Sequence, residues 1–212
     1  MKRTFIFTGG AVNSYSDLPI KPKDTDLIIC ADSGINHCIA MNLVPHIWVG
    51  DFDSADYDSL IKSKLLKDTK IVRLLPCKDD TDTEHAMHMA IDMGFSNIVV
   101  VGGFGGRLDH TLANAYLAEE AYRHGVTLIV EDDKNVLHYV KNNALHITKS
   151  KFKYISVIPI EESLVSCIGF RYPLNNEKIR RGPARGISNE LVDSDGFITV
   201  HQGGVFVVES MD

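Results

Sequence analysis

Short runs of apolar residues, mostly β-branched or aromatic, recur along the first two thirds of the chain. They predict strands at residues 4–7, 27–30, 47–49, 71–75, 98–101 and 128–130. Between the later runs, apolar residues recur at intervals of three and four, which predicts helices over 86–93 and 108–122 that end at Gly94 and Gly125. Because strands that alternate with helices are typical of parallel sheets, we expect an α/β domain at residues 1–140. Its mostly parallel, Rossmann-like sheet should carry helices on both faces.

The pattern changes after about residue 140. Apolar runs at 154–160, 164–167 and 197–200 are separated by turn residues, without helical periodicity. Gly203 and Gly204 stand between two further runs and predict a two-residue hairpin. We therefore expect a small all-β, sandwich-like domain at residues 141–212, which at this size needs support from the first domain or from a second subunit.

Composition is that of an ordinary globular protein, since 44% of the 212 residues are hydrophobic and 24% are charged. A net charge of −6 argues against nonspecific binding to nucleic acid or to anionic membranes. The four cysteines are scattered without metal or disulfide spacing, and the chain begins directly with a strand pattern rather than a signal peptide. No apolar run approaches the roughly 18 residues of a membrane helix. We expect a cytoplasmic protein that binds neither nucleic acid nor membranes.

Acidic or glycine-rich segments follow four of the predicted strands. They read Ala-Asp-Ser-Gly at 31–34, Gly-Asp-Phe-Asp-Ser at 50–54, Lys-Asp-Asp-Thr-Asp at 78–82, and Gly-Gly-Phe-Gly-Gly-Arg-Leu-Asp-His at 102–110. In a parallel sheet these segments should meet at one edge, where ligands bind. Repulsion between the carboxylates would favour a cation, and their hard oxygens suit Mg²⁺ better than zinc. An Asx turn that caps the next helix is the alternative at 50–54.

The segment at 78–82 precedes a predicted helix and also suits a phosphate group. Asp79 and Thr81 are natural N-cap residues. A helix N-terminus offers free N–H groups to a phosphate, and Lys78 and Thr81 are placed to reach the same oxygens. Capping and phosphate binding are compatible here.

The glycine run at 102–106 stands where a phosphate-binding turn would lie, between a strand and a helix. It matches neither G-x-G-x-x-G nor the P-loop, and a tight strand-to-helix turn is the alternative. Arg107 and Asp109 favour the phosphate interpretation, because arginine pairs with phosphate while aspartate can orient a hydroxyl or bind the cation.

In this order and spacing, the motifs resemble those of the thiamine pyrophosphokinase family. They are Ala-Asp-Ser-Gly-Ile-Asn at 31–36, Gly-Asp-Phe-Asp-Ser at 50–54, Lys-Asp-x-Thr-Asp at 78–82 and Gly-Gly-Arg-Leu-Asp-His at 105–110. Gly-Ile-Ser-Asn at 186–189 resembles the family's segment that contacts the thiamine ring. The resemblance implies Mg²⁺-dependent transfer of pyrophosphate from ATP to the thiamine hydroxyl, by in-line attack on the β-phosphorus, giving thiamine diphosphate and AMP. It also implies a homodimer with active sites at the subunit interface.

The resemblance further implies roles for individual residues. The magnesium ligands would be Asp51, Asp53 and Asp82, and catalysis would add Arg107 and Asp109. The nucleotide would be bound by Asp32, Lys78, Asp79, Thr81, Gly105, Gly106 and Arg107. Thiamine would contact Asp109, Ser188 and Asn189. The carboxylate that takes the hydroxyl proton stays open, as does the aromatic residue that stacks on thiamine.

Two other functions fit the same nucleotide half. One is a pyrophosphokinase of the same architecture that acts on a pterin alcohol, and its C-terminal segment would differ. The other is a noncatalytic module that holds a magnesium nucleotide. The sequence shows no Ser-His or Cys-His pair for covalent catalysis, which favours direct transfer.

Overall fold

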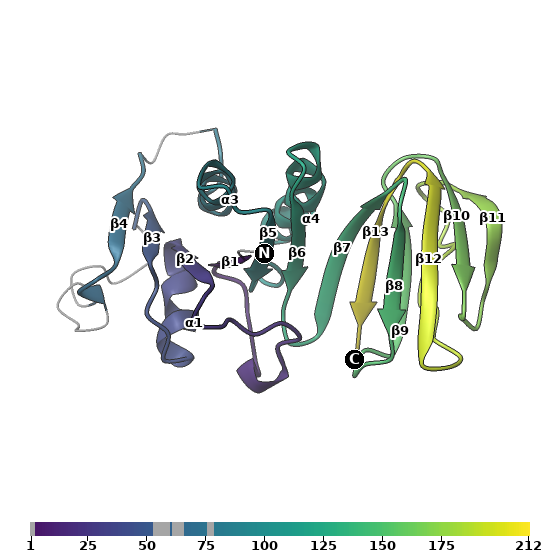
Figure 1. The fold of residues 1–212 in the computed structure, drawn as a ribbon, viewed down its shortest axis with the longest axis horizontal. Coiled ribbons are helices and arrows are strands. Elements are labelled where there is room, and N and C mark those ends of the chain that lie inside the picture. The colour runs from purple at the N-terminus through teal and green to yellow at the C-terminus, as the bar shows by residue number, and fades with distance from the viewer. Residues whose placement is uncertain (1–2, 53–59, 61–65, 76–78) are drawn as a thin grey trace. The chain divides into compact units, whose positions relative to one another are not determined.

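The structure is a computed structural model that describes residues 3–52, 60, 66–75 and 79–212. Two compact units make up the chain, Met1–Asp133 and Lys134–Asp212 (Figure 1). The second unit begins before residue 141, because strand β7 (Asn135–Lys141) pairs along its whole length with β13 (Gly204–Ser210).

The first unit is built on a parallel sheet. Its strands are β1 (Arg3–Phe7), β2 (Leu27–Ala31), β3 (Ile47–Gly50), β4 (Lys70–Arg73), β5 (Asn97–Val101) and β6 (Thr127–Glu131). They lie side by side in the order β4-β3-β2-β1-β5-β6, and each neighbouring pair is parallel. The predicted strands are thus confirmed. The fourth ends at Arg73, and Leu75 beyond it is 77% exposed.

Helices cover both faces of this sheet. Phe5 and Phe7 of β1 pack in one cluster with residues of α1 (Ile35–Ala40). Since side chains alternate across a strand, Ile6 points to the opposite face, where α3 (Asp82–Asp92) contacts β1, β2 and β3. The helix α4 (Leu108–Arg123) contacts β6 and α3.

The buried face of α4 differs from the apolar stripe that the spacing of its residues predicts. Leu108, Leu112 and Tyr122 belong to that stripe, yet all three are exposed. The residues that the helix buries are Asn114, Ala115, Leu117, Ala118 and Ala121. Most of these are small, so the helix can pack closely against β6 through alanines rather than through its larger apolar side chains.

The second unit is an antiparallel β sandwich. In one sheet β13 pairs with β7 on one side and with β9 (Tyr154–Pro159) on the other. The other sheet has the order β11 (Leu174–Ile179), β10 (Ser163–Ile168), β12 (Asp195–Gln202), β8 (Ala144–Thr148). The two sheets share one core, in which Val157 and Val207 pack with Val165 and Ile198. The predicted all-β domain is confirmed.

The hairpin predicted at Gly203 and Gly204 is wrong. The strand β12 pairs with β10 and β8, whereas β13 pairs with β7 and β9, so these consecutive strands belong to different sheets. Gly203 has a φ of +83°, a conformation open to glycine, at the point where the chain crosses between sheets. Two glycines predict a reversal of the chain, but the partner of each strand is decided by the apolar faces that must be buried.

Candidate active site

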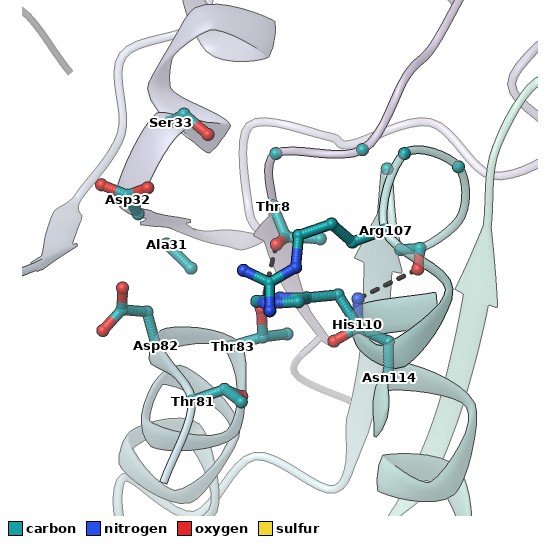
Figure 2. A pocket seen from close by; sticks show the side chains of 16 residues that line it. Thr8, Ala31, Asp32, Ser33, Thr81, Asp82, Thr83, Arg107, His110 and Asn114 are labelled. Atoms are coloured by element: carbon teal, nitrogen blue, oxygen red, sulfur yellow. Dashed lines mark hydrogen bonds between the residues drawn. The ribbon is translucent and has the colours of Figure 1, made fainter. Parts of the chain in front are cut away.

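A cavity of about 310 Å³ lies at the carboxyl-terminal edge of the parallel sheet. The loops after β1, β2 and β5 line it, together with the first turns of α3 and α4 (Figure 2). Along the sheet, the chain runs outward from β1 to β4 and then returns to place β5 on the other side of β1. Ligands of open α/β sheets bind at such a reversal of strand order, and the cavity lies there.

Two glycine turns form the floor of this cavity. The N–H of Gly10, after β1, donates to the carbonyl oxygen of Gly102, after β5, at 2.8 Å. A Cβ atom at Gly10 would collide with the carbonyl oxygens of Gly102 and Phe104, so the two turns approach each other closely only without side chains. The glycine run after β5 is among the predicted site segments, whereas Thr8, Gly9 and Gly10 are not. The Gly-Gly pair directly after the first strand was the available signal.

Three carboxylates lie together beside the floor. Asp32, Asp51 and Asp82 each offer an oxygen atom within 4.8 Å of the others, and all three side chains are partly buried. Asp32 and Asp51 follow the adjacent strands β2 and β3, and Asp82 opens α3. Such a cluster of hard oxygen ligands fits a cation of the Mg²⁺ type. Figure 2 shows Asp32 and Asp82 on one side of the cavity, facing Arg107 and His110.

The helix α3 is fixed by residues that also line the cavity. The side-chain oxygen of Thr81 accepts a hydrogen bond from the N–H of Glu84 at 3.1 Å and so caps the helix. The hydroxyls of Thr8 and Thr83 lie 2.9 Å apart and connect the loop after β1 to the same helix. Thr81 thus caps the helix and lines the cavity at the same time. Asp79 is exposed nearby.

Asp53 and Lys78, which the sequence places at the site, lie outside the residues that the structure describes. Gly105 and Gly106 line the cavity with φ of +87° and +68°. Asn114, which is not among the predicted site residues, also lines it and donates to the carbonyl oxygen of Gly103 at 2.9 Å from within α4. No simple motif would have indicated that contact.

Arg107 lines the cavity and is held by Asp109. Its Nη2 and Nε donate to the two carboxylate oxygens at 2.6 and 3.2 Å. Both side chains are largely exposed, at 72% and 65%. The hydrogen bond from Arg107 is the main cause that lowers the pKa of Asp109 to about 2. Asp109 is therefore ionised at neutral pH and is a weak base as long as Arg107 holds it.

Ser188 and Asn189 lie in the second unit, where Asn189 lines a smaller cavity of about 140 Å³. Asn189 is 6% exposed, and its amide accepts from the N–H of Tyr172 at 2.9 Å and donates to the carbonyl of Tyr172 at 2.8 Å. Ser188 has a φ of +55°, and its N–H donates to Ser156 Oγ at 3.0 Å. The Asn189 side chain thus joins two segments of the sandwich.

We expect Asn189→Ala to lower the free energy of unfolding by about 1–3 kcal/mol, because it removes both hydrogen bonds that the buried Asn189 amide makes with the backbone of Tyr172. Denaturant unfolding measures the loss, with the exposed Asn175→Ala of β11 as the matched control. Unchanged stability would instead mean that the two hydrogen bonds to Tyr172 do not hold the fold together.

Comparison with known proteins agrees with this arrangement of two units. Residues 21–130 match the family model "Thiamin pyrophosphokinase, catalytic domain", and residues 142–205 match "Thiamin pyrophosphokinase, vitamin B1 binding domain". The chain is 30% identical over 216 residues to the thiamine pyrophosphokinase of Bacillus subtilis, covering 100% of both chains. It is also 30% identical over 176 residues to thiamin pyrophosphokinase 1 of Caenorhabditis elegans, covering 78% of this chain and 70% of the relative.

Solved structures show the same fold. The thiamine pyrophosphokinase of B. subtilis superimposes with a TM-score of 0.90 at 29% identity, over 100% of both chains. The thiamin pyrophosphokinase of Geobacillus thermodenitrificans gives a TM-score of 0.85 at 28% identity, over 99% of this chain and 98% of the other. No helix in the described part of the chain is long and apolar enough to cross a membrane. Both family models and full-length similarity therefore establish that this chain belongs to the thiamine pyrophosphokinase family of transferases.

Proposed function

We propose that this chain transfers the pyrophosphoryl group of ATP to the hydroxyl of thiamine, giving thiamine diphosphate and AMP. The observation that carries the proposal is the cavity at the reversal of strand order. There the carboxylates of Asp32 and Asp82 face Arg107 across a floor of glycine turns. This combination suits a triphosphate with its cation, and it occurs in a chain of the thiamine pyrophosphokinase family.

Backbone groups and Arg107 would bind the phosphates. The first turns of α3 and α4 both border the cavity, and the N–H groups of a helix N-terminus attract anions. The turn at Gly105 and Gly106 adds N–H groups without side chains that would exclude the ligand. Arg107 would leave Asp109 to pair with a phosphate, a stronger acceptor that carries more charge. We propose Lys78 and Asp79 as further nucleotide contacts.

Asp51 and Asp82, joined by Asp32, are the residues that would hold Mg²⁺ in this proposal. Their oxygens already lie within 4.8 Å of one another, and oxygen donors of this kind are what the ion prefers. When bound, Mg²⁺ neutralises negative charge on the phosphates during transfer. Asp53 completes the proposed set.

The transfer step requires orientation more than covalent catalysis. The thiamine hydroxyl oxygen forms a bond to the β-phosphorus, the bond from that phosphorus to the oxygen bridging to the α-phosphorus breaks, and AMP leaves with that oxygen. The hydroxyl proton passes to a carboxylate or to water. Asp109 becomes a better acceptor once Arg107 has turned to the phosphates, because the main cause of its low pKa is then removed.

We also propose a homodimer whose subunits together complete each active site. The proposed thiamine contacts Ser188 and Asn189 belong to the second unit, whereas the nucleotide cavity is formed by the first. The apolar residues Leu108, Leu112 and Tyr116 lie exposed along α4, next to the cavity, which is compatible with cover by another subunit. Light scattering at micromolar concentration should give twice the mass of one chain, and a monomer in the presence of substrates would contradict the dimer.

A cytoplasmic location is part of the proposal as well. Cys30 and Cys38 are buried thiols whose sulfur atoms lie 3.1 Å apart, and a reducing compartment would keep them unlinked.

Incubation of the protein with ATP, Mg²⁺ and thiamine tests the function, with AMP and thiamine diphosphate quantified together. We expect equal amounts of both products and no AMP when thiamine is omitted. A pterin alcohol in place of thiamine tests the nearest alternative substrate. Turnover with the pterin alone would reject thiamine, and tight ATP binding without turnover on either alcohol would indicate a noncatalytic nucleotide module.

A further inference from the structure

A buried histidine lies beneath the glycine floor of the cavity. His37 belongs to α1 and is 8% exposed. Its Nε2 lies 2.8 Å from the carbonyl oxygen of Gly10, and its Nδ1 lies 2.9 Å from the hydroxyl of Tyr15. Both ring nitrogens are therefore engaged, which is more than packing alone requires.

The partners of His37 determine its protonation. The carbonyl of Gly10 can only accept, so Nε2 carries the proton, and in the neutral ring Nδ1 accepts from the hydroxyl of Tyr15. Burial lowers the pKa of His37, while hydrogen bonds to the backbone at Gly10 and Thr8 oppose the shift without cancelling it. The ring is thus neutral at pH 7, with a single N–H aimed at the floor.

The contact with Gly10 acts on both glycine turns at once. Gly10 also donates its own N–H to the carbonyl of Gly102, so its peptide groups connect His37 to the turn after β5. A Cβ atom at Gly102 would lie 3.0 Å from His37 Nε2, which shows how closely the ring approaches this second turn. Gly10 and Gly102 both line the cavity, whereas the ring lies behind them and is not among the lining residues.

We propose that His37 is a positioning residue that orients the Gly10 carbonyl and, through it, the two glycine turns that receive the nucleotide phosphates. This inference rests on the proposed nucleotide site. His37 does not touch the nucleotide. Its single donor keeps the Gly10 peptide from rotating, so that the N–H groups of the floor stay directed as the phosphates require.

Three substitutions separate donation from packing. His37→Phe keeps the ring volume but removes both polar contacts. His37→Gln keeps an amide donor close to the position of Nε2. Cys38→Ala is the matched control, because Cys38 is the next residue of α1, is 0% exposed and does not line the cavity. It removes buried volume from the same helix without altering the contact with Gly10.

We expect His37→Phe to weaken the affinity for a nonhydrolysable ATP analogue with Mg²⁺ by about tenfold or more, measured by calorimetry. His37→Gln should recover most of that affinity. Cys38→Ala should lower the temperature of thermal unfolding while the affinity stays that of the wild type. In turnover assays the loss in His37→Phe should be larger in the KM for ATP than in kcat, since the reacting groups remain.

Equal affinities in wild type and His37→Phe would overturn the inference, as would a loss in His37→Gln that matches that in His37→Phe. A loss of affinity of the same size in Cys38→Ala would also overturn the inference, because destabilised packing alone would then explain the effect of His37→Phe. The wild type distinguishes this result from a failure of the proposed function. A wild type that binds the analogue but makes no AMP with thiamine rejects the proposed reaction and leaves the affinities of the variants as a valid test.

Discussion

Asp82→Asn and Asp51→Asn should each reduce turnover by about 10²-fold or more while the protein stays folded. A bound metal ion stabilises charge in the transition state by several kcal/mol, and each factor of ten in rate corresponds to about 1.4 kcal/mol, so loss of one of the carboxylates that hold the ion should slow turnover strongly. Asparagine keeps the shape of aspartate but lacks its charge. Removing one of three neighbouring negative charges relieves repulsion, which offsets the loss of an acidic group at the start of α3 in Asp82→Asn.

Steady-state assays with ATP and thiamine measure the loss, and thermal unfolding is followed in parallel. Asp92→Asn is the matched control, because Asp92 is exposed at the other end of the same helix. Added Mg²⁺ should raise the unfolding temperature of the wild type and of Asp92→Asn more than that of Asp82→Asn. Full activity in both site variants, with unchanged unfolding, would refute the assignment of the cation to these carboxylates.

Arg107→Gln should have the second large effect, a decrease in turnover of about 10²- to 10³-fold. Glutamine can donate a hydrogen bond but cannot place a positive charge beside the transferred group. Arg107→Lys should recover only part of the activity, because a lysine lacks the two parallel donors of the guanidinium. A variant Arg107→Gln with near-normal kcat would exclude Arg107 from the transfer step.

The partner of Arg107 provides the control. Asp109→Asn leaves the guanidinium without its competing carboxylate, so affinity for ATP should stay the same or increase even if turnover falls.

The pKa of Asp109 is lowered from 3.8 to about 2 in the folded state. The ion pair therefore stabilises the folded protein fully at pH values above the pKa of the unfolded state, and this stabilisation is lost as the pH falls through the pKa of the folded state. Between pH 5 and 9 the pair does not titrate. A change in ATP affinity over that range would have to come from other groups.

The pterin-alcohol and nucleotide-module alternatives differ from the proposed function in the second unit rather than in the first. The match of residues 142–205 to a vitamin B1 binding domain favours thiamine. The nucleotide half alone would not have separated these possibilities, since carboxylates, glycine turns and an arginine suit any magnesium triphosphate.

The sequence by itself determined the fold class and the edge of the sheet at which the acidic and glycine-rich segments meet. Apolar runs and helical spacing predicted the parallel strands, because these patterns reflect burial of local segments. The motifs also predicted that Asp51, Asp82 and Arg107 lie at the same edge of the sheet, since the carboxyl ends of parallel strands share an edge.

Only the tertiary structure decided which groups actually meet. Asp32 joins Asp51 and Asp82 because β2 lies between β1 and β3, an order that no local pattern encodes. No local pattern encodes the contact of His37 with Gly10 either, because the two residues are 27 positions apart in the chain. The prediction of a hairpin at Gly203 was wrong for a related reason, since each strand pairs with the neighbour that lets it bury its apolar face. Local sequence reports the conformation of each segment, whereas partners depend on the packing of all segments together.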